Sequence, residues 1–187
     1  MKRLRLLPLL AAVAVLIVTA FTGASAVAST PALNNQQFLP GLLPPEGKVL
    51  LIGAVARPQL LTVADLAAMP QRTVTVQFRT PRGVETHTYT GPRLFDVLTQ
   101  AGPQFDPAIR NDRLRHFISF TASDNYRALV AWGEIDPNFE NKDVLLATTE
   151  DGRSLAADGP RLVVPGDIAG GRYVFNVVRV FLQKPPL

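Results

Sequence analysis

The sequence contains no cysteine, and this absence excludes disulfide bonds and every metal site that needs a thiolate ligand. Aromatic residues make up 7% of the 187 residues and charged residues 18%, but 47% are hydrophobic, which is enough for one globular domain with a buried core. The two histidines, His87 and His116, lie far apart and have no metal-ligand spacing. No serine stands in a nucleophile elbow, so conventional catalytic classes have little support.

The longest apolar stretch is also shorter than the roughly 20 residues of a membrane-spanning helix. Leu6 to Phe21 has 16 residues, follows three basic residues, and precedes small residues that form A-x-A patterns ending at Ala26 and Ala28. This arrangement is typical of a secretory signal peptide and predicts cleavage of residues 1–28 and a periplasmic or secreted protein. An uncleaved membrane anchor is the alternative.

Positive charge is scarce once this segment is set aside. The whole chain has a net charge of +4, but residues 1–28 hold three basic residues and no acidic one. The remainder has 16 basic against 15 acidic residues, a net charge of +1. A polyanion-binding surface is therefore not expected, and nucleic acid is not a predicted partner.

The rest of the chain alternates short apolar stretches with Pro- and Gly-containing turns. Residues 29–47 predict a flexible leader and residues 48–187 a folded domain. Thr62 and Asp65 predict a capped short helix, and apolar residues at helical spacing predict a second helix over 94–101 that Gly102 ends. The expected strands are 48–55, 73–79, 84–89, 116–122, 126–131, 143–149, 161–164 and 173–182. The pattern predicts an α+β fold that is single and compact, mixed in its sheet pairing, dominated by strands and equipped with short helices.

Two stretches could present ligand-binding side chains at strand ends. Residues 121–127 form an expected tight turn that can display Ser123, Asp124 and Tyr126; the alternative is an ordinary hairpin turn in which Tyr126 packs across the strands. Trp132 is the only tryptophan, and it either stacks on a flat ligand or belongs to the core.

A third stretch, residues 159–173, is rich in glycine. Gly170 and its neighbour would let a ligand approach backbone N–H groups, and Arg172 could bind a phosphate or a carbonyl edge. The alternative is a strand connection in which Arg172 is paired with a carboxylate.

In this order, the motifs resemble the molybdopterin-binding domain of the sulfite oxidase family, in its small exported single-domain form. The resemblance covers about residues 48–183. The segments that carry it are Gly53-Ala54-Val55, Leu61-Thr62-Val63-Ala64-Asp65-Leu66, Tyr89-Thr90-Gly91, Leu94-Phe95-Asp96-Val97-Leu98, Ser123-Asp124-Asn125-Tyr126-Arg127, Glu134-Ile135-Asp136-Pro137, Leu145-Leu146-Ala147, Asp151-Gly152 and the run from Arg161 to Tyr173.

One departure from the family stands out. The catalytic members ligate molybdenum through a cysteine after the early strand pair, and the matching stretch here, about Gln77 to Arg82, has no sulfur. Loss of a soft thiolate ligand weakens the case for a working molybdenum centre. In this respect the chain resembles small members of the family that lack the cysteine. The resemblance to these members implies a pterin-binding sensor that regulates a membrane-bound signalling or redox partner.

The resemblance therefore implies a module that binds a pterin or molybdopterin, with no metal held by the protein. Stacking would come from Tyr126 or Trp132, and an acid such as Asp124 or Asp167 would accept from the aminopyrimidine edge. The residues implied as ligand-binding are Arg79, Ser123, Asp124, Tyr126, Trp132, Asp167, Gly170 and Arg172, and none is expected to be catalytic. A molybdenum oxidoreductase with non-cysteine ligation and a structural or adaptor protein with an empty pocket are the alternatives.

Overall fold

The computed structural model describes residue 44 and residues 47–184. The predicted signal peptide and nearly all of the predicted leader lie outside these residues. The strands are β1 (Lys48–Gly53), β2 (Gln59–Thr62), β3 (Gln71–Thr80), β4 (Gly83–Pro92), β5 (Phe117–Ala122), β6 (Arg127–Ala131), β7 (Leu145–Ala147), β8 (Thr149–Glu150), β9 (Arg153–Ser154), β10 (Arg161–Val163) and β11 (Val177–Gln183). The helices are α1 (Val63–Ala67), α2 (Leu94–Ala101) and α3 (Trp132–Ile135), with 3-10 turns η2 (Asp112–Arg115) and η3 (Gly170–Arg172).

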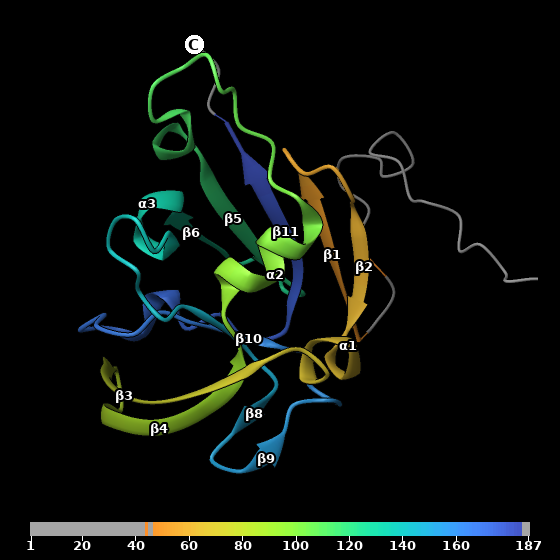
Figure 1. The fold of residues 1–187 in the computed structure, drawn as a ribbon. Coiled ribbons are helices and arrows are strands. Elements are labelled where there is room, and N and C mark those ends of the chain that lie inside the picture. The colour runs from red at the N-terminus through yellow and green to blue at the C-terminus, as the bar shows by residue number, and fades with distance from the viewer. Residues whose placement is uncertain (1–43, 45–46, 185–187) are drawn as a thin grey trace, which may run out of the picture. The chain divides into compact units, whose positions relative to one another are not determined.

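A five-stranded mixed sheet forms one layer of the fold, in the order β2-β1-β11-β5-β6 (Figure 1). The last strand, β11, lies in its middle, parallel to β1 and antiparallel to β5. Helix α2 lies in front of this sheet in Figure 1 and buries Leu94, Val97, Leu98 and Ala101 in the larger core. This one-sided apolar stripe is what helical spacing predicts, and Gly102 ends the helix with a φ of 73°.

A second sheet has the order β3-β4-β8-β9, and β7 and β10 form a separate two-stranded ribbon. Strands β3 and β4 pair as a long antiparallel hairpin that lies at the bottom of Figure 1. Gly91 near the end of β4 touches the backbone of Leu146, so a side chain there would collide with the ribbon. A smaller core of eight buried residues fills the space under the hairpin and includes Phe78, Tyr89 and Tyr173.

The predicted fold class is confirmed, and several local predictions are as well. Thr62 and Asp65 form a reciprocal capping box at the start of α1. The expected strand 173–182 begins only at Val177, because η3 and a turn with Asn176 at φ 43° precede it. Strand 143–149 is likewise split into β7 and β8, and β2 and α3 had not been expected. Among residues 47–184, no helix is long and apolar enough to cross a membrane.

Candidate functional site

The candidate site surrounds a pair of stacked aromatic rings in the smaller core. The ring centroids of Phe78 and Tyr173 lie 4.0 Å apart, with the planes inclined by 23°. Phe78 comes from β3 and Tyr173 from the turn after η3, and both are buried. Gly170 lies directly against the Phe78 ring, because a Cβ added there would be 2.9 Å from Cδ2 of that ring. The lack of a side chain at residue 170 therefore allows the segment that contains Gly170 and Gly171, here called the glycine loop, to pack directly on β3.

On one side of this stack is a hollow of about 240 Å³, here called the aromatic hollow. It is lined by Ala122, Asp124, Tyr126, Gly170, Gly171, Tyr173, Val174 and Phe175. Tyr126 is 50% exposed and Phe175 is 63% exposed, so two large rings face solvent at its rim. The Tyr126 hydroxyl donates to the Gly171 carbonyl at 2.7 Å, which fixes the tyrosine against the glycine loop.

Two residues that line the aromatic hollow have polar atoms without a hydrogen-bond partner in the described part of the chain. Asp124 Oδ1 accepts from the Tyr126 backbone N–H at 2.9 Å, and within residues 47–184 its Oδ2 has no hydrogen-bond donor. The Tyr173 hydroxyl is buried and also has no hydrogen-bond partner in the described part of the chain. Burial raises the pKa of Tyr173, and the Asp167 carboxylate adds to this, so the phenol stays neutral. An unsatisfied buried hydroxyl is unfavourable by about 1–3 kcal/mol, which a bound polar ligand could relieve.

A second hollow of about 310 Å³ lies at the C-terminal end of β3, and we call it the hairpin hollow. Its lining residues are Gln77, Phe78, Arg79, Val84, Gly166, Asp167 and Ile168. The Arg79 backbone N–H donates to the Ile168 carbonyl at 2.9 Å, which ties β3 to this loop. The guanidinium of Arg79 forms no ion pair with any described residue.

Arg172 lies between the two hollows and is fully engaged by carboxylates. Its Nε and Nη2 donate to the two oxygens of Asp167 at 2.8 and 2.6 Å, and Nη1 donates to both oxygens of Glu134 at 3.1 Å. The hydrogen bonds to Asp167 raise the pKa of Arg172 further above its ordinary value. The structure therefore places Arg172 as a clamp between the glycine loop and α3, and leaves it little capacity for a ligand.

Trp132 does not reach either hollow. It is 2% exposed, its ring packs edge-on against Phe105 at 4.8 Å, and its indole N–H donates to Asp136 Oδ2 at 2.8 Å. The stacking role considered for Trp132 is therefore wrong, because the ring is enclosed by the larger core. Ser123 is exposed beside the aromatic hollow without lining it, and its backbone N–H donates to the Asn176 carbonyl.

The eight residues implied by the resemblance thus separate into groups. Asp124, Tyr126 and Gly170 line the aromatic hollow, and Arg79 and Asp167 line the hairpin hollow. Ser123, Trp132 and Arg172 line neither hollow.

Phe175 and Arg161 belong to the site but were missed by sequence reasoning. The Arg161 guanidinium lies 3.4 Å from the centroid of the Phe175 ring, and Nη1 donates to Glu150 at 2.7 Å. Both residues also line a third hollow of about 450 Å³, so Phe175 forms a wall shared with the aromatic hollow. An arginine within the apolar stretch 161–164 was the available signal, because a buried cation needs partners.

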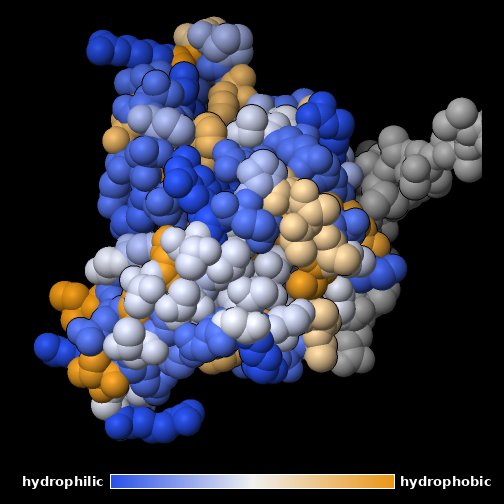
Figure 2. All heavy atoms as spheres, turned by 60° about the horizontal axis from the view of Figure 1, so that its bottom comes forward, coloured by the Kyte–Doolittle hydropathy of each residue, from blue (hydrophilic) through white to orange (hydrophobic). Residues whose placement is uncertain are grey.

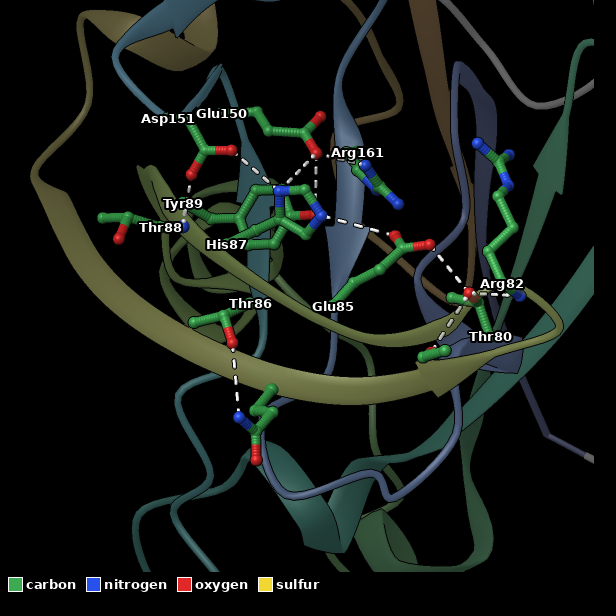
Figure 3. Close-up of polar contacts among 12 residues, drawn as sticks. Thr80, Arg82, Glu85, Thr86, His87, Thr88, Tyr89, Glu150, Asp151 and Arg161 are labelled. Carbon is green, nitrogen blue, oxygen red and sulfur yellow. Dashed lines mark hydrogen bonds and ion pairs between the residues drawn. The ribbon is translucent and has the colours of Figure 1, made fainter.

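A polar network adjoins the stacked rings, because the His87 ring lies 5.9 Å from the Phe78 ring between centroids. Its side chains are drawn in Figure 3. His87 Nδ1 and Asp151 Oδ2 are 2.7 Å apart, and the Tyr89 hydroxyl donates to Glu150 at 3.0 Å. One ligand atom each from His87, Glu150 and Asp151 lie within 4.8 Å of one another, a grouping that could hold a metal ion. However, Arg161 already neutralises Glu150, and His87 is already bonded to Asp151. Glu150 and Asp151 therefore already have partners among the described residues.

The network predicts a pH dependence of stability. The hydrogen bond to Asp151 raises the pKa of His87, so the stabilisation from protonated His87 is complete below its unfolded pKa of about 6.5. It is lost as the pH rises through the higher folded pKa. In urea unfolding between pH 6 and 9, the wild-type protein should therefore lose more free energy of unfolding than a His87→Gln variant. The same change in free energy of unfolding with pH in both proteins would contradict this prediction.

Comparison with known proteins identifies the family to which this site belongs. The chain matches the oxidoreductase molybdopterin binding domain over residues 44–184, about three quarters of its length. The chain belongs to this family. The fold is similar to that of the sulfane dehydrogenase SoxCD from Paracoccus pantotrophus, with a TM-score of 0.59 and 22% identity. That match covers 74% of this chain and 38% of the SoxCD chain. No curated protein matches the chain.

Membership of the molybdopterin-binding family raises the question of whether these residues suit a molybdenum centre. The stretch from Gln77 to Arg82, where the resemblance implies a ligating cysteine, contains no sulfur. Its inward-facing side chain is Phe78, which is 3% exposed and occupied by its contact with Tyr173. An aromatic ring offers no ligand atom to a metal, so this donor set does not fit a thiolate-held molybdenum.

Proposed function

We propose that the protein is an exported pterin-binding module that informs a membrane-bound signalling or redox partner and does not itself catalyse a reaction. The observation that carries this proposal is the aromatic hollow, where Tyr126 and Phe175 expose their rings beside the free carboxylate oxygen of Asp124. Family membership supports a molybdopterin-type ligand, and the missing cysteine argues against metal chemistry.

The chemistry of a pterin matches these groups. A pterin is flat and aromatic, so exposed rings can stack on its faces. Its aminopyrimidine edge carries N–H donors, and a carboxylate such as Asp124 can accept two hydrogen bonds from this edge, as from a guanidinium. Gly170 and Gly171 leave room for the ligand to approach the backbone, and the unpartnered Tyr173 hydroxyl offers one further hydrogen bond.

Export to the periplasm is part of the proposal and rests on the sequence of residues 1–28. The basic residues, apolar stretch and small residues follow the order of a cleaved leader. Mass spectrometry of the protein isolated from its native compartment tests this directly. A mature N-terminus just after Ala26 or Ala28 is expected, and an intact leader in a membrane fraction would overturn it.

Removing either exposed ring should weaken pterin binding. Phe175→Ala and Tyr126→Ala are each expected to lower the affinity for neopterin about five- to hundredfold, the range for loss of an aromatic stacking partner. Binding is measured through the fluorescence of neopterin. Phe139→Ala is the matched control, because Phe139 is 42% exposed but lines none of the three hollows, and its affinity should stay unchanged. Equal affinities of all three variants and the wild-type protein would show that the hollow is misassigned.

The alternative functions are separated by analysis of the purified protein. Released pterin without stoichiometric molybdenum supports the sensor module. Stoichiometric molybdenum would overturn it in favour of an oxidoreductase with non-cysteine ligation. Absence of both, with no neopterin binding in titration, would overturn it in favour of a structural or adaptor protein.

A further inference from the structure

The edge strand β3 has backbone groups that no described part of the chain pairs. It is the outermost strand of its sheet, and its pairing with β4 runs without a register shift from Gln71 opposite Pro92 to Thr80 opposite Gly83. Only its C-terminal end is covered, where the Arg79 N–H donates to the Ile168 carbonyl. The edge from Gln71 to Gln77 is therefore open within residues 47–184.

The pairing of β4 shows which β3 residues turn their backbone outward. Thr88 uses its N–H and carbonyl toward Asp151, and the Thr90 carbonyl accepts from Thr148, all on the side away from β3. In an antiparallel pair, directly opposed residues either bond each other or both turn away. The residues opposite them, Thr75 and Thr73, therefore direct their N–H and carbonyl groups to the open edge.

Gln77 is two residues beyond Thr75, so its backbone N–H and carbonyl also point to the open edge. The Arg79 N–H, two residues further on, points the same way, since it donates to the Ile168 carbonyl. Three residues thus offer up to six backbone hydrogen bonds. Their side chains form hydrogen bonds with side chains of β4: Thr73 with Thr90 at 2.8 Å, Thr75 with Thr88 at 3.0 Å and Gln77 with Thr86 at 3.3 Å.

This edge lacks the features that normally prevent strand addition. Residues 73–77 contain no charge, proline or glycine, and no bulge interrupts them. Thr73, Thr75 and Gln77 are all exposed. Figure 2, which turns this sheet toward the viewer, shows a pale band of side chains with intermediate hydropathy across the lower half of the view. A regular, uncharged and exposed edge is a template for an additional strand.

The surroundings of the edge indicate the chemistry of that strand. Arg72 and Arg79 flank it, both are exposed, and neither has an ion-pair partner among the described residues. The hairpin hollow lies at its C-terminal end, where Val84 and Ile168 are 60% and 73% exposed. Cations at both ends favour carboxylates, and the hollow favours an apolar side chain.

We propose that an extended acidic segment of a partner protein adds to β3 as a further strand. Its backbone pairs with Thr73, Thr75 and Gln77, its carboxylates face Arg72 and Arg79, and an apolar residue enters the hairpin hollow. A second copy of this chain is a poorer occupant, because it would bring the same two arginines to an edge that has no counter-charge. This interface is independent of pterin binding.

The test uses the full mature protein and a synthetic probe, an acetylated and amidated peptide of eight residues with glutamate at each end and valine and threonine between, because Arg72 and Arg79 lie on opposite faces of β3. Amide hydrogen exchange measured by NMR should slow at least tenfold at Thr73, Thr75 and Gln77 when the peptide is saturating. A peptide with lysine in place of glutamate should give no protection. Protection by both peptides, or by neither, overturns the proposal. Protection without peptide also overturns it, because another copy or the chain itself would then cover the edge.

Variants localise the contact. Thr75→Pro removes an outward N–H that the β3–β4 ladder does not use, and we expect it to weaken acidic-peptide binding at least tenfold. Thr75→Val keeps the backbone donor and should bind within twofold of the wild-type protein. Equal loss in both variants would contradict backbone pairing. Neopterin affinity should be unchanged in Thr75→Val, which separates failure of this interface from failure of the proposed pterin site.

Discussion

Replacing Trp132 by alanine is expected to lower the free energy of unfolding by about 3–5 kcal/mol, the range for truncating a fully buried large aromatic residue. The ring is 2% exposed and packs against Phe95 and Phe105. Its indole N–H is one of the donors to Asp136, a carboxylate that is itself 1% exposed. The alanine variant therefore leaves both a cavity and a less well satisfied buried acid. Urea unfolding followed by circular dichroism measures the loss.

Trp132→Phe separates packing from the hydrogen bond. It keeps most of the ring volume but removes the N–H donor, so a smaller loss of about 1–3 kcal/mol is expected. This folded variant should bind neopterin with the affinity of the wild-type protein, because the indole lies outside the aromatic hollow. Tenfold weaker neopterin binding by folded Trp132→Phe would return Trp132 to the ligand site. A loss below 1 kcal/mol in Trp132→Ala would contradict its place in the core.

Predictions from the sequence succeeded where the determining contacts are local. The capping box joins Thr62 to a residue three positions away, and the buried stripe of α2 follows from helical spacing alone. The alternation in residues 73–79 likewise predicts which side chains of β3 face the core, and Val76 and Phe78 are indeed buried. The order of such local motifs was sufficient to identify the family.

Side-chain roles in the site depend on contacts between distant segments, and sequence patterns do not specify them. Arg172 meets Glu134 across 38 positions, and Tyr126 meets Gly171 across 45. Phe175 was overlooked because the predicted last strand included it, whereas the turn before Val177 brings it to the rim of the hollow. A glycine-rich loop therefore indicated the right region, but the partners of its charged and aromatic residues came from the fold.

Arg172→Met is expected to lower the free energy of unfolding by about 2–4 kcal/mol, since it leaves the partly buried Asp167 without a cation among the described residues and Glu134 with Lys142 alone. The side chains of Asp167 and Glu134 are only 18% and 20% exposed, and both accept hydrogen bonds from the guanidinium. Arg153→Met is the matched control. Its ion pair with Asp158 is 2.7 Å long but exposed, so a change below about 1 kcal/mol is expected.

The pH dependence of the Arg172→Met variant distinguishes lost charge pairing from lost packing. In the wild-type protein, hydrogen bonds and the nearby cation hold the pKa of Glu134 low despite its burial, so its stabilisation is lost as the pH falls through that pKa. In the variant the Arg172 cation no longer lowers the pKa of Glu134, whereas burial still raises it, so the folded-state pKa of Glu134 should rise. Protonation of Glu134 at lower pH then relieves the cost of burying its poorly paired charge. The difference in free energy of unfolding between the wild-type protein and Arg172→Met, measured by urea unfolding, should therefore be smaller at pH 5 than at pH 7. A difference that stays constant over this pH range would mean that Arg172 stabilises the protein through packing of its aliphatic stem. Ion pairing with the carboxylates would then not be what holds the glycine loop in place.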